Sequence, residues 1–155
     1  MALQWAMTEV LFYHLERRPL EAVLPQLLEK TLARGWRAVV AAGSAERVEA
    51  LSAALWTWRD EAFLPHGTRQ DGHAARQPIW LTDASENPNG AQVLFLVDGA
   101  AAENLDGLER AVYVFDGRDA EAVEAARRRW REAGSAGHDV TYWREDESGK
   151  WQKMA

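Results

Sequence analysis

Short apolar runs alternate with segments of helical periodicity along this chain, and this alternation limits the folds that it can adopt. Residues 9–14, EVLFYH, form an apolar run typical of a strand. Residues 19–34 then carry leucines at helical spacing, with Pro19 suited to a first helical turn. A second strand-like run at 36–42, WRAVVAA, precedes a helix that begins at Ser44 as an N-cap. The first half of the chain is therefore predicted to form a βαβα unit.

The second half of the chain continues this alternation. Residues 67–77 are polar and rich in glycine, which indicates a surface loop. After this loop we expect strands at 78–82, 92–97, 110–115 and 138–143, and a helix at 119–133. Alternating strands and helices predict an α/β fold: a single doubly wound, mostly parallel sheet with helices on both faces, as in Rossmann-like proteins.

With 155 residues, the chain has the length of one domain with one substantial core. We expect this domain to span residues 7–143. Residues 1–6 are interpreted as an N-terminal extension, and residues 144–155 as a charged C-terminal tail that frays.

The composition excludes several classes of function. The net charge of −6 argues against a whole surface built to bind phosphate backbones, so any nucleic-acid role would need a local patch. The chain has no cysteine, which removes disulfides, thiol catalysis and thiolate metal sites. No apolar run approaches the ~20 residues of a membrane helix, and the features of a signal peptide are missing. We expect a soluble, cytoplasmic protein without membrane contact.

Because a doubly wound sheet suggests nucleotide binding, we compared the first two strand-to-helix turns with known phosphate-binding motifs. The turns read HLERRPLE and AAGSAERVE, and neither contains G-x-G-x-x-G or a P-loop. Gly43 and Ser44 could bind an anion through backbone N–H groups, but an ordinary N-cap explains them more simply. No cofactor is predicted.

Two carboxylates support an enzymatic alternative. Asp98 and Asp116 follow predicted strands, at the carboxyl ends where α/β enzymes place metal ligands and acid–base groups. They would suit a metal-dependent enzyme that acts on a phosphorylated small molecule. Each is also followed by glycine, and Asp-Gly after a strand is an ordinary turn signal. No other residue supplies a nucleophile or a matching base, which favours the turn interpretation.

The four histidines do not indicate a metal site. His14, His66, His73 and His138 lack the spacing of zinc ligands. His66 is interpreted as a residue at the end of a strand whose ring is satisfied by a backbone carbonyl group.

The predicted helix at 119–133 combines an apolar stripe with basic residues. The stripe consists of Val123, Ala126, Trp130 and Ala133. Arg127 and Arg131 lie one turn apart along its flank. Such a set can receive a peptide that carries an aromatic group and carboxylates. Equally, Trp130 can belong to the core while the arginines are solvated, and the pattern alone leaves both interpretations open.

A second cluster of aromatic residues occurs in the segment at residues 55–67, LWTWRDEAFLPHG. Leu55 continues the stripe of the second helix and is interpreted as core. Trp56 and Trp58 are two positions apart, so they cannot both point into the same core face of a helix. At least one is expected to face outward, as the aromatic anchors of protein interfaces do.

Four segments together carry a family resemblance: FYHLER at 12–17, LLEKTLARGWRAVV at 27–40, ALWTWRDEAFLPHG at 54–67 and QPIWLT at 77–82. They resemble the chi subunit of bacterial DNA polymerase III. The resemblance extends from Met7 to about Trp143, and LW…FLPH is its most specific element.

The resemblance implies a non-catalytic accessory subunit of the clamp-loader complex, in a holoenzyme that is a DNA-directed DNA polymerase. Its expected partners are the psi subunit, which tethers it to the clamp loader, and the acidic, Phe-terminated C-terminal tail of single-stranded DNA-binding protein. A repair helicase of the YoaA type is expected to take the psi-facing surface instead of psi. DNA would then be reached only indirectly, which agrees with the acidic charge.

The resemblance also assigns residues to these two surfaces. Trp56, Phe63 and Pro65 match the surface that faces psi or the helicase. Four further residues match the positions that receive the tail: Arg127, Trp130, Arg131 and Tyr142. Family members commonly have tyrosine and lysine where this chain has Trp130 and Arg131, and a usually basic position falls here on Val123.

Overall fold

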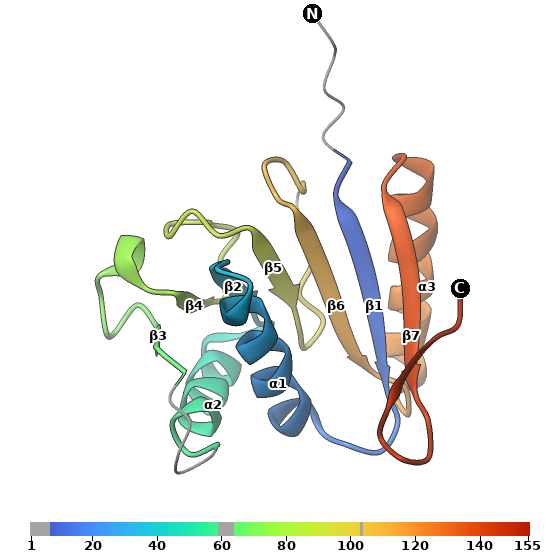
Figure 1. Cartoon of the computed structure of the whole chain (residues 1–155), viewed down its shortest axis with the longest axis horizontal. Helices are drawn as coiled ribbons and strands as arrows, with labels where there is room; N and C mark the ends of the chain where they lie inside the picture. Colours follow the sequence, from blue (N-terminus) through green and yellow to red (C-terminus); the bar gives the residue numbers. More distant parts are fainter. Residues whose placement is uncertain (1–6, 59–63, 103) are drawn as a thin grey trace, which may run out of the picture.

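The computed structural model describes residues 7–58, 64–102 and 104–155, which fold around one eight-stranded sheet (Figure 1). The strands are β1 (Glu9–Leu15), β2 (Ala38–Ala41), β3 (His66–Gly67), β4 (Ile79–Thr82), β5 (Val93–Leu96), β6 (Arg110–Asp116), β7 (Asp139–Glu145) and β8 (Trp151–Lys153). The helices are α1 (Leu20–Ala33), α2 (Ala45–Trp56) and α3 (Ala120–Ser135), with a short 3-10 helix η1 (Ala74–Arg76).

The order of the strands confirms the predicted fold class. The sheet runs β3-β4-β2-β5-β6-β1-β7-β8, and its neighbouring strands are parallel except for the antiparallel pair β7–β8. From β1, the chain passes through α1 and α2 to strands that lie on one side of β1 in the sheet. From β6, it passes through α3 and crosses β1 to reach β7, which lies on the other side of β1. Because crossovers between parallel strands keep one hand, α3 lies on the opposite face of the sheet from α1 and α2.

Local sequence signals set the ends of the helices. The hydroxyl group of Ser44 accepts a hydrogen bond from the Arg47 backbone N–H at 3.2 Å, as predicted for an N-cap. At α3 the carboxylate of Asp119 accepts from the backbone N–H of Glu121 at 3.0 Å. Helix α1 ends before Gly35, whose φ of 80° is costly for residues that carry a Cβ.

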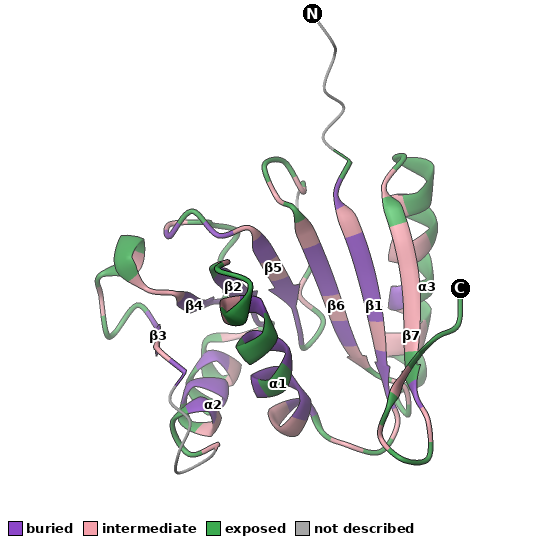
Figure 2. Ribbon diagram, in the orientation of Figure 1, coloured by how far each residue is buried: buried purple, intermediate pink, exposed green. Residues whose placement is uncertain are grey.

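The core is divided between the two faces of the sheet, and Figure 2 shows the buried strands at its centre. The larger part lies between the sheet and helices α1 and α2, and includes Leu28, Leu51 and Phe95. The smaller part lies under α3, where Phe12 and Ala126 are buried among half-buried aromatic rings. The α3 side of the molecule is therefore held by fewer fully buried side chains than the other side.

Three short elements were not predicted from the sequence. β3 and η1 occur at 66–67 and 74–76; His66 was interpreted as the end of a strand, but residues 67–77 were predicted to form a polar loop without such elements. Residues 144–155 were expected to fray, but β7 continues to Glu145 and β8 pairs with β7. The ring of Trp151 packs edge-on against Tyr13 at 4.7 Å between centroids. This contact joins residues distant in sequence and explains why the segment is ordered.

None of the described helices has the length and apolar character needed to cross a bilayer.

Candidate functional site

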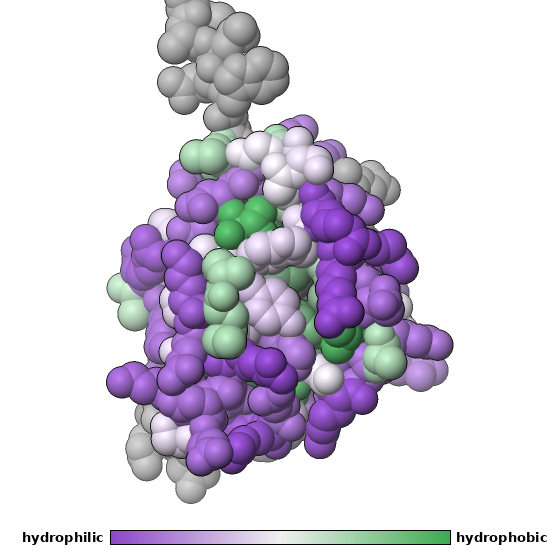
Figure 3. Space-filling view, turned by 90° about the vertical axis from the view of Figure 1, so that its right-hand side faces the viewer, coloured by the Kyte–Doolittle hydropathy of each residue, from purple (hydrophilic) through white to green (hydrophobic). Residues whose placement is uncertain are grey.

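Helix α3 and strands β1 and β7 bring together the residues that the pattern of the last helix singled out. We call this the α3–β7 surface: Arg127, Trp130 and Arg131 on α3, Tyr142 on β7 and His14 on β1. The parallel pairing of β1 with β7 places the strand residues side by side, and α3 packs over both strands. Figure 3 looks at this side of the molecule and shows pale and green uncharged groups surrounded by hydrophilic ones.

Trp130 is half-buried on the inner side of α3. Its ring packs edge-on against Phe12 at 5.7 Å and against Tyr142 at 5.8 Å between centroids. These contacts anchor the indole on the small core. Because the side chain is not fully covered, Trp130 is both a core residue and part of the surface.

Arg127 and Arg131 are exposed on α3. Neither forms an ion pair or a hydrogen bond with any residue in the described part of the chain. Burial is the main influence on the pKa of both His14, where it lowers the pKa, and Tyr142, where it raises it; the positive charge of nearby Arg127 is a smaller, lowering influence on the pKa of each group. The guanidinium group of Arg127 therefore stands beside the aromatic cluster with its hydrogen-bond donors available to a ligand.

A short hydrogen bond links β1 to β7 beneath these arginines. Nδ1 of His14 lies 2.5 Å from the hydroxyl oxygen of Tyr142. Burial lowers the pKa of His14, and the nearby guanidinium group of Arg144 lowers it further. Burial raises the pKa of Tyr142, so its hydroxyl group keeps its proton at neutral pH.

An ion pair borders the same cluster. The guanidinium group of Arg144 donates from Nε to Oε1 of Glu16 at 2.8 Å, and a second N–H of Arg144 donates to the same oxygen. The hydrogen bond from Arg144 lowers the pKa of Glu16, so this carboxylate is charged at neutral pH. Arg144 is thus occupied within the protein, in contrast to Arg127.

His14 was not predicted to be a member of this surface, although its position in the sequence carries a signal. His14 is two residues after Phe12 on a strand, and residues at this spacing point to the same face of a sheet. Since Phe12 is buried under α3, its face also carries His14. Tyr142 and Arg144 are also two positions apart on one strand, so their side chains point to the same face of the sheet. Val123, where the resemblance led us to expect a basic residue, is half-buried in the first turns of α3.

A second surface lies at the end of α2, and we call it the Trp56 surface: Trp56 with Pro65 and His66. Trp56 is 56% exposed, and its ring contacts that of His66 at 4.9 Å between centroids. Trp58 is half-buried against the main core. The prediction that at least one of these tryptophans faces outward is therefore confirmed.

The other predicted residues near Trp56 have different surroundings. His66 is buried, with Nδ1 2.6 Å from the carbonyl oxygen of Leu64, which confirms the interpretation of its ring as satisfied by the backbone. Pro65 is half-buried. Phe63, which the resemblance assigns to this surface, lies outside the described residues.

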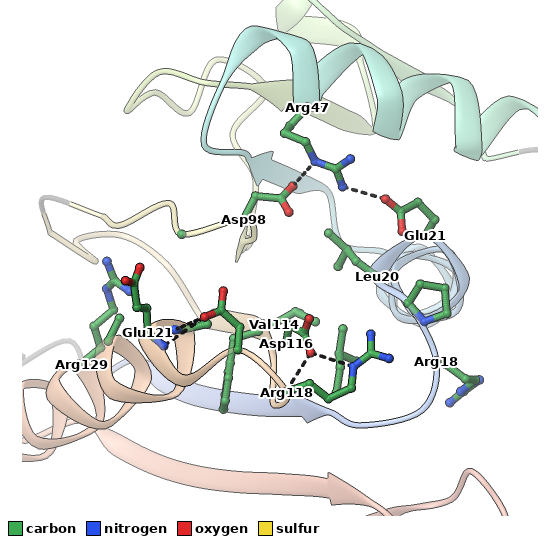
Figure 4. Close-up of a pocket in the computed structure, with 17 residues that line it drawn as sticks. Arg18, Leu20, Glu21, Arg47, Asp98, Val114, Asp116, Arg118, Glu121 and Arg129 are labelled. Atoms are coloured by element: carbon green, nitrogen blue, oxygen red, sulfur yellow. Dashed lines mark hydrogen bonds and ion pairs between the residues drawn. The ribbon is translucent and has the colours of Figure 1, made fainter.

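Asp98 and Asp116 line a common cavity of about 530 Å³ at the carboxyl edge of the sheet (Figure 4). Arg47 donates from Nε to Asp98 at 2.9 Å and from Nη2 to Glu21 at 2.7 Å. Asp116 accepts from the backbone N–H and from Nε of Arg118 at 2.9 and 3.2 Å, and the backbone hydrogen bond is the main reason why its pKa is lowered. Both carboxylates are therefore engaged by guanidinium groups.

This arrangement favours the turn interpretation of the two carboxylates. Asp98 has a φ of 51° and Gly99 a φ of 81°, as in a tight turn after a strand. Within the residues that the structure describes, no group of three or more His, Cys, Asp or Glu side chains could hold a metal ion.

Comparison with known proteins places the chain in a family. The sequence model of the family described as DNA polymerase III chi subunit, HolC, matches residues 7–141. A probable DNA polymerase III subunit chi from Rickettsia prowazekii (strain Madrid E) is 28% identical over 109 residues, a match that covers 70% of this chain and 66% of that relative. The chain therefore spans slightly less than two thirds of the relative's length. Since the family match includes most of the sequence, with every described element from β1 to α3 and the start of β7, this chain belongs to the family of DNA polymerase III chi subunits.

Proposed function

We propose that this protein is a non-catalytic adaptor in DNA replication, which couples the clamp loader of DNA polymerase III to single-stranded DNA-binding protein. In this role it binds psi through the Trp56 surface and the acidic, Phe-terminated tail of single-stranded DNA-binding protein through the α3–β7 surface. The observation that carries the proposal is the combination of Arg127 and Arg131, free of ion pairs with the described residues, with the half-buried Trp130.

The chemistry of the α3–β7 surface suits such a tail. A guanidinium group binds a carboxylate through two parallel N–H groups, and the two arginines stand one helical turn apart. The ring of a terminal phenylalanine would pack against Trp130 and Tyr142, which already form edge-on aromatic contacts. Acidic groups and an aromatic ring in one short segment therefore find complementary partners in the same place.

The Trp56 surface supports a second, simultaneous contact. It adjoins β3 and β4 at one end of the strand order, whereas β7 and α3 stand at the other end. An exposed tryptophan next to polar groups is typical of the anchors of protein interfaces. The distance between the two surfaces allows one protein to hold two partners, with psi and a YoaA-type helicase as alternatives at the Trp56 surface.

The proposal also explains the acidic charge of the chain. An adaptor that reaches DNA only through single-stranded DNA-binding protein has no need of a basic, phosphate-binding face, and its net charge of −6 is compatible with a cytoplasmic replication complex.

The test is a fluorescence-anisotropy titration of a labelled acidic peptide that ends in phenylalanine. We expect the wild-type protein to bind the peptide, and Arg127→Ala to weaken binding about tenfold or more, since charged hydrogen bonds are worth about 1.5–3 kcal/mol. Binding should also weaken as the salt concentration rises.

Arg128→Ala is the matched control, because Arg128 is an exposed arginine on the same helix but outside the α3–β7 surface. It removes the same charge and should change affinity much less than Arg127→Ala. Absence of binding by the wild type, or equal losses in both variants, would contradict the proposed site. A parallel pull-down with psi, comparing wild type with Trp56→Ala, tests the other surface.

A further inference from the structure

The hydrogen bond between His14 and Tyr142 gives the α3–β7 surface a property that its arginines alone would not have. We propose that His14 is a positioning residue of this surface, which takes up a proton when an acidic peptide binds and acts through the hydroxyl group of Tyr142. This inference rests on the proposed function, because it concerns the same surface and the same class of ligand.

The imidazole ring of His14 is held in place on several sides. The side chain is buried, and Nδ1 lies 2.5 Å from the Tyr142 hydroxyl oxygen. The ring packs edge-on against Phe115 at 5.2 Å between centroids. Gly117 lies so close that a Cβ at that position would be 1.9 Å from Nε2 of His14. A ring confined in this way changes its hydrogen bonds mainly by gaining or losing protons.

Charged groups face His14 from each of the elements around it. Glu16 follows β1 in the chain, and its Oε1 lies 3.7 Å from Nε2 of His14. Asp116 at the end of β6 and Glu16 favour the protonated imidazole, whereas Arg144 of β7 and Arg127 of α3 oppose it. Burial and the two arginines prevail and lower the pKa of His14, so the ring is neutral at neutral pH in the free protein.

The neutral ring and an incoming carboxylate compete for one proton. With Nε2–H facing Glu16, Nδ1 of the neutral ring accepts the hydrogen bond from the Tyr142 hydroxyl group. A hydroxyl group has a single proton to donate, so Tyr142 cannot serve His14 and a ligand carboxylate together. Once His14 is protonated, Nδ1–H donates to the Tyr142 oxygen, and the hydroxyl proton becomes available to the ligand.

The charge of the ligand acts in the same direction. Carboxylates bound at Arg127 offset the positive charge that disfavours protonation of His14 in the free protein. Binding therefore raises the pKa of His14, and one proton from solvent is added to the ring without any other chemical change. By linkage, the affinity for an acidic peptide increases as the pH falls.

The experiment measures the affinity of a labelled acidic peptide ending in phenylalanine at pH 6 and pH 8, at constant ionic strength. The wild type should bind about three- to tenfold more tightly at pH 6, since a pKa change of one unit corresponds to a tenfold change in affinity. Calorimetry at pH 7 in two buffers of different ionisation enthalpy should detect proton uptake on binding. The carboxylates of the peptide are fully ionised over this range, so they do not cause the effect.

Three variants separate this role from a purely structural one. His14→Gln keeps a hydrogen-bonding side chain but cannot titrate, and should bind with no pH dependence and no proton uptake. Tyr142→Phe removes the hydroxyl group and should weaken the pH dependence without abolishing it, because the charge of the ligand at Arg127 still acts on His14. His138→Gln should retain the wild-type profile, because His138 precedes β7 at the far end of the strand, where it accepts from the Thr8 backbone N–H. Circular dichroism confirms that each variant is folded.

The possible outcomes distinguish the inference from the proposed function. Peptide binding by the wild type with a flat pH profile, or an unchanged pH dependence in His14→Gln, overturns the role of His14 and leaves the adaptor proposal standing. No binding by the wild type at either pH overturns the proposed function and this inference with it.

Discussion

The backbone of Gly43 lies against the carbonyl oxygen of Asp98, so close that a Cβ on Gly43 would stand 2.4 Å from that oxygen. The turn after β2, which leads into α2, meets the turn after β5, which leads toward β6, at this point. Gly43→Ala would force one of the turns to move, and we expect it to lower the free energy of unfolding by about 1–3 kcal/mol. Urea denaturation followed by circular dichroism measures this change.

Gly134→Ala provides the matched control for that substitution. Gly134 lies in α3, its φ is not positive, and a Cβ there would meet nothing within 4 Å. The same change of residue should therefore stabilise the protein by about 0.5–1 kcal/mol through helix propensity. A destabilisation of equal size in the two variants would show that close approach to Asp98 is not the cause.

Asp119 caps α3, the helix that carries the arginines of the α3–β7 surface. Its carboxylate accepts hydrogen bonds from the backbone N–H groups of Glu121 and Ala122 at 3.0 and 3.4 Å. Asp119→Ala should destabilise the protein by about 1 kcal/mol, whereas Asp119→Ser keeps a cap and should cost less. Thermal unfolding of both variants tests the difference, and equal melting temperatures would contradict the role of the cap.

Trp56 and Trp80 should respond in opposite ways to truncation. Trp56→Ala removes a side chain that is 56% exposed, so we expect a small change in stability and a large loss of psi binding. Trp80→Ala empties a site where the side chain is 5% exposed and should cost about 3–5 kcal/mol. Chemical denaturation and a psi pull-down on both variants separate a docking residue from a core residue.

His14 also makes the stability of the protein depend on pH. Burial and Arg144 lower its pKa in the folded protein, whereas in the unfolded chain its pKa is about 6.5. The unfolded chain therefore binds this proton more readily. The contribution of His14 is present above pH 6.5 and is lost as the pH falls toward the folded-state pKa.

We therefore expect wild-type stability to fall from pH 7.5 to pH 5.5 by more than that of His14→Gln. Denaturant titrations at both pH values measure the difference between the two proteins, in which contributions that the two proteins share cancel. A fall of the same size in both proteins would contradict the buried, neutral state of His14.

The helices and the inner strands could be predicted because their signals are local. Ser44 is an N-cap that lies directly before a helical stripe, and the run at 36–42 contains the buried strand β2. β8 gave no comparable signal, because WQK is three residues long and carries a charge. It is held by β7 and by the contact of Trp151 with Tyr13, more than a hundred residues away in the chain.

The candidate site could be predicted only in part, for a similar reason. Arg127, Trp130 and Arg131 belong to one helix, so their spacing alone grouped them. His14 joins them only because β1 lies between β6 and β7, and the order of strands in a sheet does not follow from periodicity. Tyr142 was assigned by family resemblance, and the structure places its hydroxyl group against His14.

Strand β8 and the two residues that follow it, Met154 and Ala155, determine the direction from which a ligand can approach Tyr142. The backbone N–H of Tyr142 donates to the carbonyl oxygen of Ala155, and its carbonyl oxygen accepts from the N–H of Met154. The outer edge of β7 is therefore already occupied beside the aromatic cluster, and a peptide cannot add there as a further strand while β8 stays in place. A bound peptide must instead lie across the side chains, so its recognition depends on residue type, not on backbone pairing.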